Sequence, residues 1–436
     1  MRAALSTAVI AAGALVAVAA PVPAQAAPVC LSECTVSFAP GPQTTWDVPA
    51  GLSELQATVA AGAGADNLLD DDSASGGAGG TVSVDLGTAY NGQTLHLLVG
   101  DRGSLLDGQF ASGGEGSFIA APGTMLVAAG GGGGSGHINA EPIDYRALNG
   151  GAGGFSTSSA DGTAGQDYPD LTAAGSGATG ATPGGPIPLA AELGGIGSIT
   201  QVDANGVITP GEGGAAAVYR DFPTAAGGGG YAGGGGGSAR PWGQPPMNAA
   251  GSGGGGSGYL APGLTPLSTG PNTGAGFITL TYSFAPALSL AEASVTVDAS
   301  VTADVSGLPA GIDFALTLST GDELASGTTD ASGSAVVPFD VPGSEGAFTV
   351  ELRIDGAVVA SEELTVVAAP VIPPTQPTVP PTTAPADDPV SPRELAETGV
   401  DSLVPSLALT SLVFAAGAAL LIVARRGRRR GVSSER

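Results

Sequence analysis

Glycine is gathered into runs in this chain, and these runs limit what the chain can fold into. The 436 residues include 74 glycines, more than twice the usual share of about 7%. Glycine has no side chain to bury and loses more conformational freedom on folding than any other residue. A glycine run is therefore either a flexible linker or a segment packed so closely that only glycine fits. The main runs lie at 76–80, 130–136, 150–154, 227–237 and 251–258.

Apolar segments with the alternation of β-strands lie between the glycine runs. Aromatic residues such as Tyr231 and Tyr259 are embedded in the runs or next to them. Because a flexible linker would be segregated from strands rather than interleaved with them, we predict one folded glycine-rich β domain over 27–283. Its expected strands are 35–38, 55–60, 81–86, 94–99, 117–120, 125–129 and 277–284.

Five segments, at 45–51, 76–84, 97–103, 125–134 and 227–237, resemble the glycine-rich domain of the anaplastic lymphoma kinase receptor family. That domain type also occurs in bacterial surface proteins. The resemblance implies a β-sandwich whose long loops form bundled glycine helices. In the receptors the domain binds a protein cytokine, but it implies no contact residue here. An Ala/Pro/Thr-rich stretch at about 156–226 departs from the family pattern.

The charge of the chain excludes several classes of function. There are 39 acidic and 13 basic residues, for a net charge of −26, and every basic residue is Arg. Without Lys there is no Walker-type phosphate loop, no Schiff-base lysine and no isopeptide bond through a lysine of this chain. An acidic chain also lacks the basic face that nucleic-acid binding needs, so no nucleic-acid partner is expected.

The segment 1–26 is predicted to be a secretory signal peptide. Arg2 precedes an apolar stretch at 3–20, and an Ala-Gln-Ala site follows. This order of charge, apolar run and small residues is typical of such signals. Cleavage is expected between Ala26 and Ala27, which predicts a secreted protein.

Three features follow one another in the segment 395–436. The pentapeptide LAETG comes first, the uncharged stretch 403–424 second, and five arginines within 425–430 third. As a helix the uncharged stretch would be about 33 Å long, enough to cross a bilayer, and the arginines would mark its cytoplasmic end. A plain membrane anchor explains the last two features but not the pentapeptide. The residues of the pentapeptide are Leu395, Ala396, Glu397, Thr398 and Gly399.

Together these features resemble the LPxTG-type sorting signal of Gram-positive cell-wall surface proteins, in the LAxTG variant of actinobacteria. The resemblance implies a sortase as partner. The sortase thiolate would attack the Thr398 carbonyl and break the bond between Thr398 and Gly399. A peptidoglycan amine would then form an amide with Thr398. The precursor would span the membrane only before sorting, and the product would be covalently anchored to the cell wall.

Short alternating segments between turn signals continue through 284–368, at 294–298, 301–306, 312–318, 335–339, 348–353, 358–360 and 364–367. They predict an immunoglobulin-like β-sandwich, and the stretch 328–335 resembles a motif of bacterial Ig-like repeats. We expect this domain to act as a spacer. The segment 369–394 is rich in Pro and Thr, which favours an extended linker across the wall. The predicted fold class is all-β, with one C-terminal transmembrane helix.

Few residues indicate a chemical site. Cys30 and Cys34 are the only cysteines, and in an exported chain they are expected to form a disulfide. His96 is expected in a strand and His137 in a loop, and no serine lies in a G-x-S-x-G motif. No catalytic residue is therefore predicted.

Two acidic stretches, 66–72 and 161–167, could supply carboxylate oxygens to calcium. Neither has EF-hand spacing, and the second carries only one copy of a repeat that calcium-binding folds use many times. A solvated acidic loop is the preferred interpretation, so no metal and no cofactor are predicted.

The expected function is that of a sortase-anchored surface protein with a non-catalytic role, either in adhesion or as a structural part of the cell surface. Its extracellular ligand is not indicated by the sequence. The alternative is an exported hydrolase that acts at the cell wall. Acid and base residues gathered in one cleft of the glycine-rich domain would favour that alternative.

Overall fold

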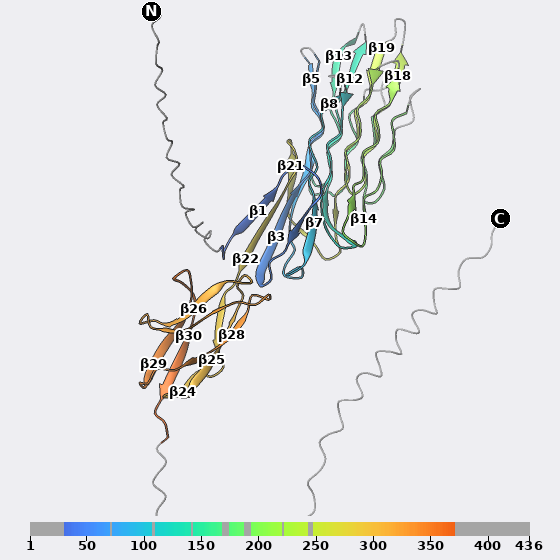
Figure 1. Ribbon diagram of the computed structural model, residues 1–436. Helices are drawn as coiled ribbons and strands as arrows, with labels where there is room; N and C mark the ends of the chain where they lie inside the picture. The colour runs from blue at the N-terminus through green and yellow to red at the C-terminus, as the bar shows by residue number, and fades with distance from the viewer. Residues whose placement is uncertain are drawn as a thin grey trace, which may run out of the picture. The chain divides into compact units, whose positions relative to one another are not determined.

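The computed structural model describes residues 30–69, 72–106, 110–140, 143–167, 174–186, 193–219, 222–242 and 247–370. Every regular element in these ranges is a β-strand (Figure 1), which confirms the all-β prediction. No helix in these ranges has the length and hydrophobicity needed to cross a membrane. The predicted signal peptide, most of the Pro/Thr-rich linker, the sorting pentapeptide and the predicted transmembrane helix at 403–424 lie outside the described residues.

Two five-stranded antiparallel sheets form the framework of the glycine-rich domain. The strand order of the first is β1 (Cys34–Phe38), β22 (Phe277–Phe284), β3 (Leu52–Ala60), β6 (Gly79–Asp85) and β21 (Pro266–Asn272). The order of the second is β2 (Thr44–Asp47), β7 (Thr94–Leu98), β10 (Ser117–Ala121), β11 (Thr124–Ala129) and β20 (Tyr259–Leu260). Strand β22 pairs with both β1 and β3. The beginning and the end of the domain therefore meet in one sheet.

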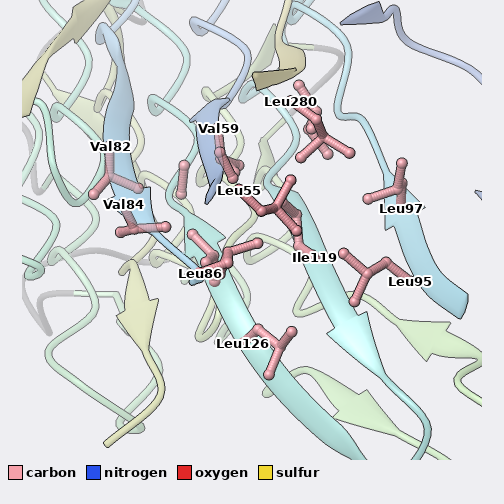
Figure 2. Close-up of a cluster of buried hydrophobic side chains, with 14 of the residues drawn as sticks. Leu55, Val59, Val82, Val84, Leu86, Leu95, Leu97, Ile119, Leu126 and Leu280 are labelled. Carbon is pink, nitrogen blue, oxygen red and sulfur yellow. The ribbon is translucent and has the colours of Figure 1, made fainter. Parts of the chain in front are cut away.

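The hydrophobic core of the domain draws on both sheets, because successive side chains of a strand point to opposite faces. In β3, Leu55 and Val59 are fully buried. Leu95 and Leu97 of β7 and Ile119 of β10 belong to the same cluster (Figure 2). Each fully buried aliphatic side chain of this kind contributes about 1.5–3 kcal/mol to folding.

The seven strands expected in this domain are all present, with ends that differ by up to three residues. A further sheet was not expected. Its strand order is β13 (Ile143–Leu148), β12 (Gly136–Ala140), β19 (Met247–Ala250) and β18 (Ala239–Trp242). Strands β12, β18 and β19 contain Gly, Pro or Asn, which are depleted in strands, and they lack a clear apolar alternation.

Four two-stranded hairpins also belong to the domain. They pair β4 (Asn67–Leu69) with β5 (Asp72–Ala74), β8 (Leu105–Leu106) with β9 (Phe110–Ala111), β14 (Gln201–Val202) with β15 (Ile208–Thr209), and β16 (Val218–Tyr219) with β17 (Phe222–Pro223). Three of them hold only two residues in each strand, too few to show a period of two in the sequence.

The segment after β22 folds around a second hydrophobic cluster, which includes the fully buried Leu316 and Leu352. A three-stranded sheet has the order β23 (Ala287–Leu290), β25 (Ser300–Ser306) and β28 (Ala335–Asp340). A five-stranded sheet has the order β24 (Ser294–Thr296), β30 (Ala357–Val367), β29 (Gly346–Ile354), β26 (Asp313–Leu318) and β27 (Glu323–Thr328). Strand β24 runs parallel to β30, and the other pairs are antiparallel.

One prediction for this segment is wrong. Two short strands were expected at 358–360 and 364–367, but the structure has the single strand β30. The polar stretch from Ser361 to Glu363 was interpreted as a break. Its side chains are exposed, and its backbone continues the pairing with β29, with Glu363 opposite Thr349. Polar residues on an exposed part of a strand do not interrupt its ladder.

Candidate functional site

The glycine runs form a bundle of extended segments that are hydrogen-bonded to one another. In the run 130–136, successive N–H groups donate to different neighbouring segments, and the pattern repeats every third residue. Three residues per turn is the repeat of polyproline II. Gly130 and Gly133 donate to carbonyls of 151–154, Gly131 and Gly134 to carbonyls of 226–229, and Gly132 and Ser135 to carbonyls of 62–65.

The carbonyl groups of the same run are used in the same way. Those of Gly130 and Gly133 accept from Gly80 and Gly77, while the carbonyl of Gly132 accepts from Gly114. Those of Gly131 and Gly134 accept from the segment 253–256. The run is thus hydrogen-bonded to six other segments. This pairing satisfies the buried backbone, which would otherwise be costly to remove from water.

Close packing of backbones explains why these positions are glycine. A Cβ atom on Gly133 would overlap the carbonyl of Gly253, and one on Gly131 would overlap the carbonyl of Gly114. The overlapping atoms are backbone atoms, which no change of rotamer can move away. The same holds for Gly237 in the run 227–237, which would meet the carbonyl of Gly251.

The stretch at 156–226 that departs from the family pattern takes part in this bundle where the structure describes it. Gly175 N donates to Ser252 O, and Gly214 N donates to Gly234 O. These segments extend the bundle with the same hydrogen bonding as the other runs.

The two histidines lie in different sheets. His96 is in β7, as expected, and its Nδ1 is 3.3 Å from Gln43 Nε2. His137 is in β12, where it pairs with Ala147 and Ala250, and not in the expected loop.

His137 is half-buried in β12, and burial lowers its pKa. Its Nδ1 is 3.3 Å from Nδ2 of the buried Asn67. Burial disfavours the charged imidazolium, so this site favours the neutral ring.

The acidic stretches considered for calcium are used within the protein where they are described. Asp66 Oδ1 accepts from Gly76 N at 2.8 Å, and Asp66 Oδ2 is 2.5 Å from Arg102 Nη2. Asp161 Oδ1 accepts from Gly180 N at 2.8 Å. Asp70 and Asp71 lie outside the described residues. Within the described ranges no three metal-ligating side chains come together.

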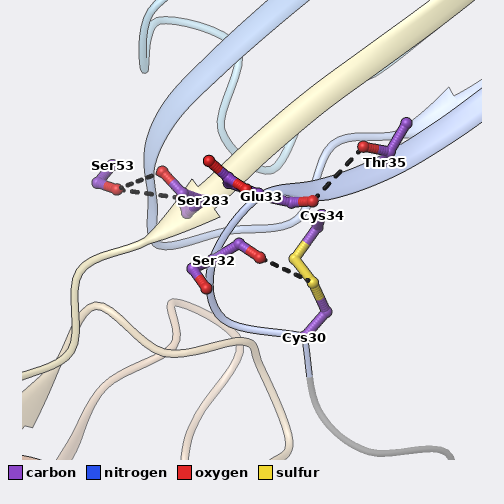
Figure 3. The surroundings of a disulfide bond; sticks show 7 residues. All are labelled: Cys30, Ser32, Glu33, Cys34, Thr35, Ser53 and Ser283. Atoms are coloured by element: carbon purple, nitrogen blue, oxygen red, sulfur yellow. Dashed lines mark hydrogen bonds between the residues drawn. A yellow bond between two sulfur atoms is a disulfide. The ribbon is translucent and has the colours of Figure 1, made fainter.

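Cys30 and Cys34 are joined by a disulfide (Figure 3). The bond closes a small loop that leads into β1, of which Cys34 is the first residue. Inside the loop, Leu31 O accepts from Phe284 N at 2.8 Å. The loop is thereby attached to the end of β22, the strand next to β1.

A cavity of about 320 Å³ on the glycine bundle was not expected from the sequence. Two exposed carboxylate residues line it, Glu115 and Glu212. Glu115 Oε2 accepts from Asp101 N at 3.1 Å. The remaining lining residues are Leu98, Gly113, Gly114, Gly116, Pro210, Gly211, Gly213, Gly227 and Gly229.

A sequence signal for this cavity exists. Glu115 and Glu212 are the only charged residues of the chain with glycine on both sides. A charged residue inside a glycine run is unusual, because a segment enclosed by other backbones has no room for a side chain. Both glutamates therefore had to lie at the surface of the bundle. That they line one cavity depends on the packing of segments about 100 residues apart, which the sequence does not reveal.

The residues predicted to be processed lie outside the described part of the chain. These are Ala26 and Ala27 at the signal-peptide site and the pentapeptide 395–399. None of the sequence-predicted site residues that the structure describes lines the cavity.

Comparison with models of protein families gives a match. The model of a domain family, described as a glycine-rich domain, matches residues 38–283, which is more than half of the chain. No curated protein matches the sequence. The matched range begins at the end of β1 and closes within β22.

Proposed function

The chain belongs to the glycine-rich domain family through residues 38–283, and we propose that this domain is the exposed part of a surface protein that a sortase anchors to the cell wall. Its role there is non-catalytic, in adhesion or in the architecture of the cell surface. The observation that carries the proposal is the order of LAETG, an uncharged stretch and an arginine cluster in 395–436.

Each part of the chain has a place in this proposal. The signal peptide 1–26 directs export, with cleavage between Ala26 and Ala27. The uncharged stretch 403–424 and the arginines hold the precursor in the membrane. The sortase cysteine attacks the Thr398 carbonyl, the segment from Gly399 onward leaves, and a peptidoglycan amine takes the acyl group.

The middle of the chain then positions the glycine-rich domain outside the wall. We interpret 284–368 as an Ig-like spacer, which is supported by two sheets around one core. The linker 369–394 is interpreted as an extended stalk, which reaches roughly 70 Å if its proline-rich part rises by about 3.1 Å per residue. The bundled runs are interpreted as glycine helices of the polyproline II type, which is supported by their three-residue hydrogen-bond period.

Thr398→Ala tests the anchoring. The variant is expected to stay in the membrane fraction, while the wild-type protein is released from the wall by a muramidase as a covalent adduct. Thr382→Ala, in the linker, is the matched control and should be sorted normally. Recovery of Thr398→Ala in the muramidase-released fraction would contradict the proposal.

One observation favours the alternative of an exported hydrolase, namely two carboxylates that line one cavity. Glycoside hydrolysis uses such a pair on either side of the scissile bond. The full chain should therefore be assayed for release of sugars from peptidoglycan. Turnover that is lost in both Glu115→Gln and Glu212→Gln would establish a hydrolase and overturn the non-catalytic role.

A further inference from the structure

We propose that the cavity lined by Glu115 and Glu212 binds an organic cation, an alkylammonium or alkylguanidinium group on a short aliphatic stem. This binding site goes beyond the anchoring role. It is also independent of that role, because every lining residue belongs to the glycine-rich domain.

The polar side chains that line the cavity are hydrogen-bond acceptors. Both glutamate side chains offer carboxylate oxygens, and no other lining residue has a polar side chain. The backbone of Gly113, Gly116 and Gly213 adds carbonyl oxygens and N–H groups that have no hydrogen bond within the described part of the chain. A ligand that pairs with the two carboxylates has to supply donors.

The backbone donors beside the two carboxylates are already in use. Glu115 N donates to Asp101 O at 2.9 Å, and Glu212 N donates to Ser198 Oγ at 2.8 Å. An anion would therefore find two negative side chains and no donor from either glutamate. An ammonium brings three donors and a guanidinium five, together with a positive charge, and bonds from such groups to carboxylates are among the stronger ones.

The size of the cavity fits an occupant larger than a bare ion. At about 320 Å³ it has room for several groups the size of a water molecule, whose share of liquid volume is about 30 Å³. Leu98 and Pro210 add apolar surface to the lining. An aliphatic stem can lie against such surface while its charged end reaches the carboxylates, as the stems of Lys and Arg do elsewhere.

Two further features favour the binding of a cation. Parts of the lining are held in place by packing and hydrogen bonding, and the negative charge of the protein attracts cations. Leu98 packs against the buried cluster that contains Phe118 and Ala128. The bond from Asp101 N places one oxygen of Glu115 before a ligand arrives, which lowers the entropy cost of binding. The net charge of −26 raises the local concentration of cations at the surface.

The test uses the full chain and small probes of defined charge. N-butylguanidinium and N-butylammonium are titrated at low salt and followed by ligand-observed NMR. N-butylurea, which has the shape of the guanidinium probe without its charge, is the matched control ligand. The cations are expected to bind with a Kd on the order of 1 mM, and the urea at least tenfold more weakly. Equal binding of the urea, or no binding of either cation, would overturn the proposal.

Two double variants distinguish binding at the cavity from a general effect of the protein's negative charge. Glu115→Gln/Glu212→Gln should weaken binding of N-butylguanidinium at least tenfold. It should leave the melting temperature unchanged, since the side-chain amide oxygen of the substituted residue can still accept from Asp101 N. Glu292→Gln/Glu323→Gln removes the same charge from exposed positions in the second folded segment, and should bind like the wild type. If both double variants lose affinity equally, the cavity is not the site.

Two further titrations show whether the cation is a side chain of a partner protein or a small molecule, and whether calcium binds at the cavity instead. A capped Gly-Arg-Gly peptide is compared with its citrulline counterpart. Preference for the arginine peptide assigns the site to a side chain of a partner protein, whereas binding of the free amine and guanidine probes alone assigns it to a small cation. Both results support the proposal. Calcium that binds in a manner dependent on Glu115 and Glu212, with no binding of the organic cations, would refute it.

Discussion

At the scale of the residue, the backbones of the glycine bundle pack so closely that they leave no room for a Cβ atom. In ordinary sheets the side chains keep stacked backbones about 10 Å apart. Here Gly131 and Gly133 are hydrogen-bonded through backbone atoms to segments on all sides, and a Cβ on either would meet a carbonyl. Glycine is therefore required by the space between the segments, although it costs more conformational entropy than any other residue.

Gly133→Ala is expected to destabilise the domain by at least about 2 kcal/mol, because the added methyl group overlaps the backbone of Gly253 and a packed interior cannot widen without loss elsewhere. Gly270→Ala is the control. A Cβ on Gly270, which is in β21, meets nothing within 4 Å, and its effect should stay within about 0.5 kcal/mol. Thermal unfolding of the full chain measures both. Equal melting temperatures for the two variants would show that the bundle is not closely packed.

At the scale of the element, the sequence was informative wherever a strand buries one face. Strands such as β3 and β22 were predictable because their apolar residues alternate, and burial against a core enforces that period of two. Strands β18 and β19 were missed because they are short and have no apolar alternation; β18 pairs with the adjacent β19, and β19 with the distant β12. In β30 the exposed polar stretch 361–363 was interpreted as a break, although the strand and its pairing with β29 continue through it.

The arrangement of the glycine runs could not be predicted for a different reason. One glycine run is chemically the same as another, so nothing in the residues 130–134 specifies which segments surround them. The strands at the ends of the runs supply that register, since they carry the side chains that distinguish one position from the next. The cavity could not be predicted from the sequence for the same reason, because it exists only once 113–116, 211–213 and 227–229 are placed together.

One polar side chain connects the elements of the two large sheets. Ser117 in β10 is fully buried, donates to Ala60 O at 2.7 Å and accepts from Gly100 N at 3.0 Å. Ser117→Ala leaves both backbone groups without this partner, so the free energy of unfolding should fall by about 1–3 kcal/mol.

Ser37→Ala is the matched control, since Ser37 is an exposed strand residue whose hydroxyl contacts only that of Thr279, at 3.2 Å. Urea unfolding should show a lower midpoint for Ser117→Ala alone. A midpoint equal to that of the wild type would mean that the buried hydroxyl does not connect the two sheets.

At the scale of the whole glycine-rich domain, the last strand pairs with strands from the beginning of the domain. Strand β22 completes the first sheet between β1 and β3, with Tyr282 opposite both Cys34 and Leu55. The segment 253–256 at the far end of the domain also donates to the central run 130–136. The bundle is therefore complete only when the last strand is in place, and its segments are expected to open together rather than one by one.

Hydrogen exchange of the full chain, read by mass spectrometry, tests this cooperative opening. Amides of the runs 130–136, 227–237 and 251–258 should be protected on the order of 10³-fold or more, because buried, paired amides open only with the domain. The exposed stretch 343–345, whose amides donate no hydrogen bond within the described part of the chain, serves as the internal control, with exchange close to the rate of an unfolded chain. If the glycine runs exchanged as fast as that stretch, they would behave as flexible linkers and the bundle would be refuted.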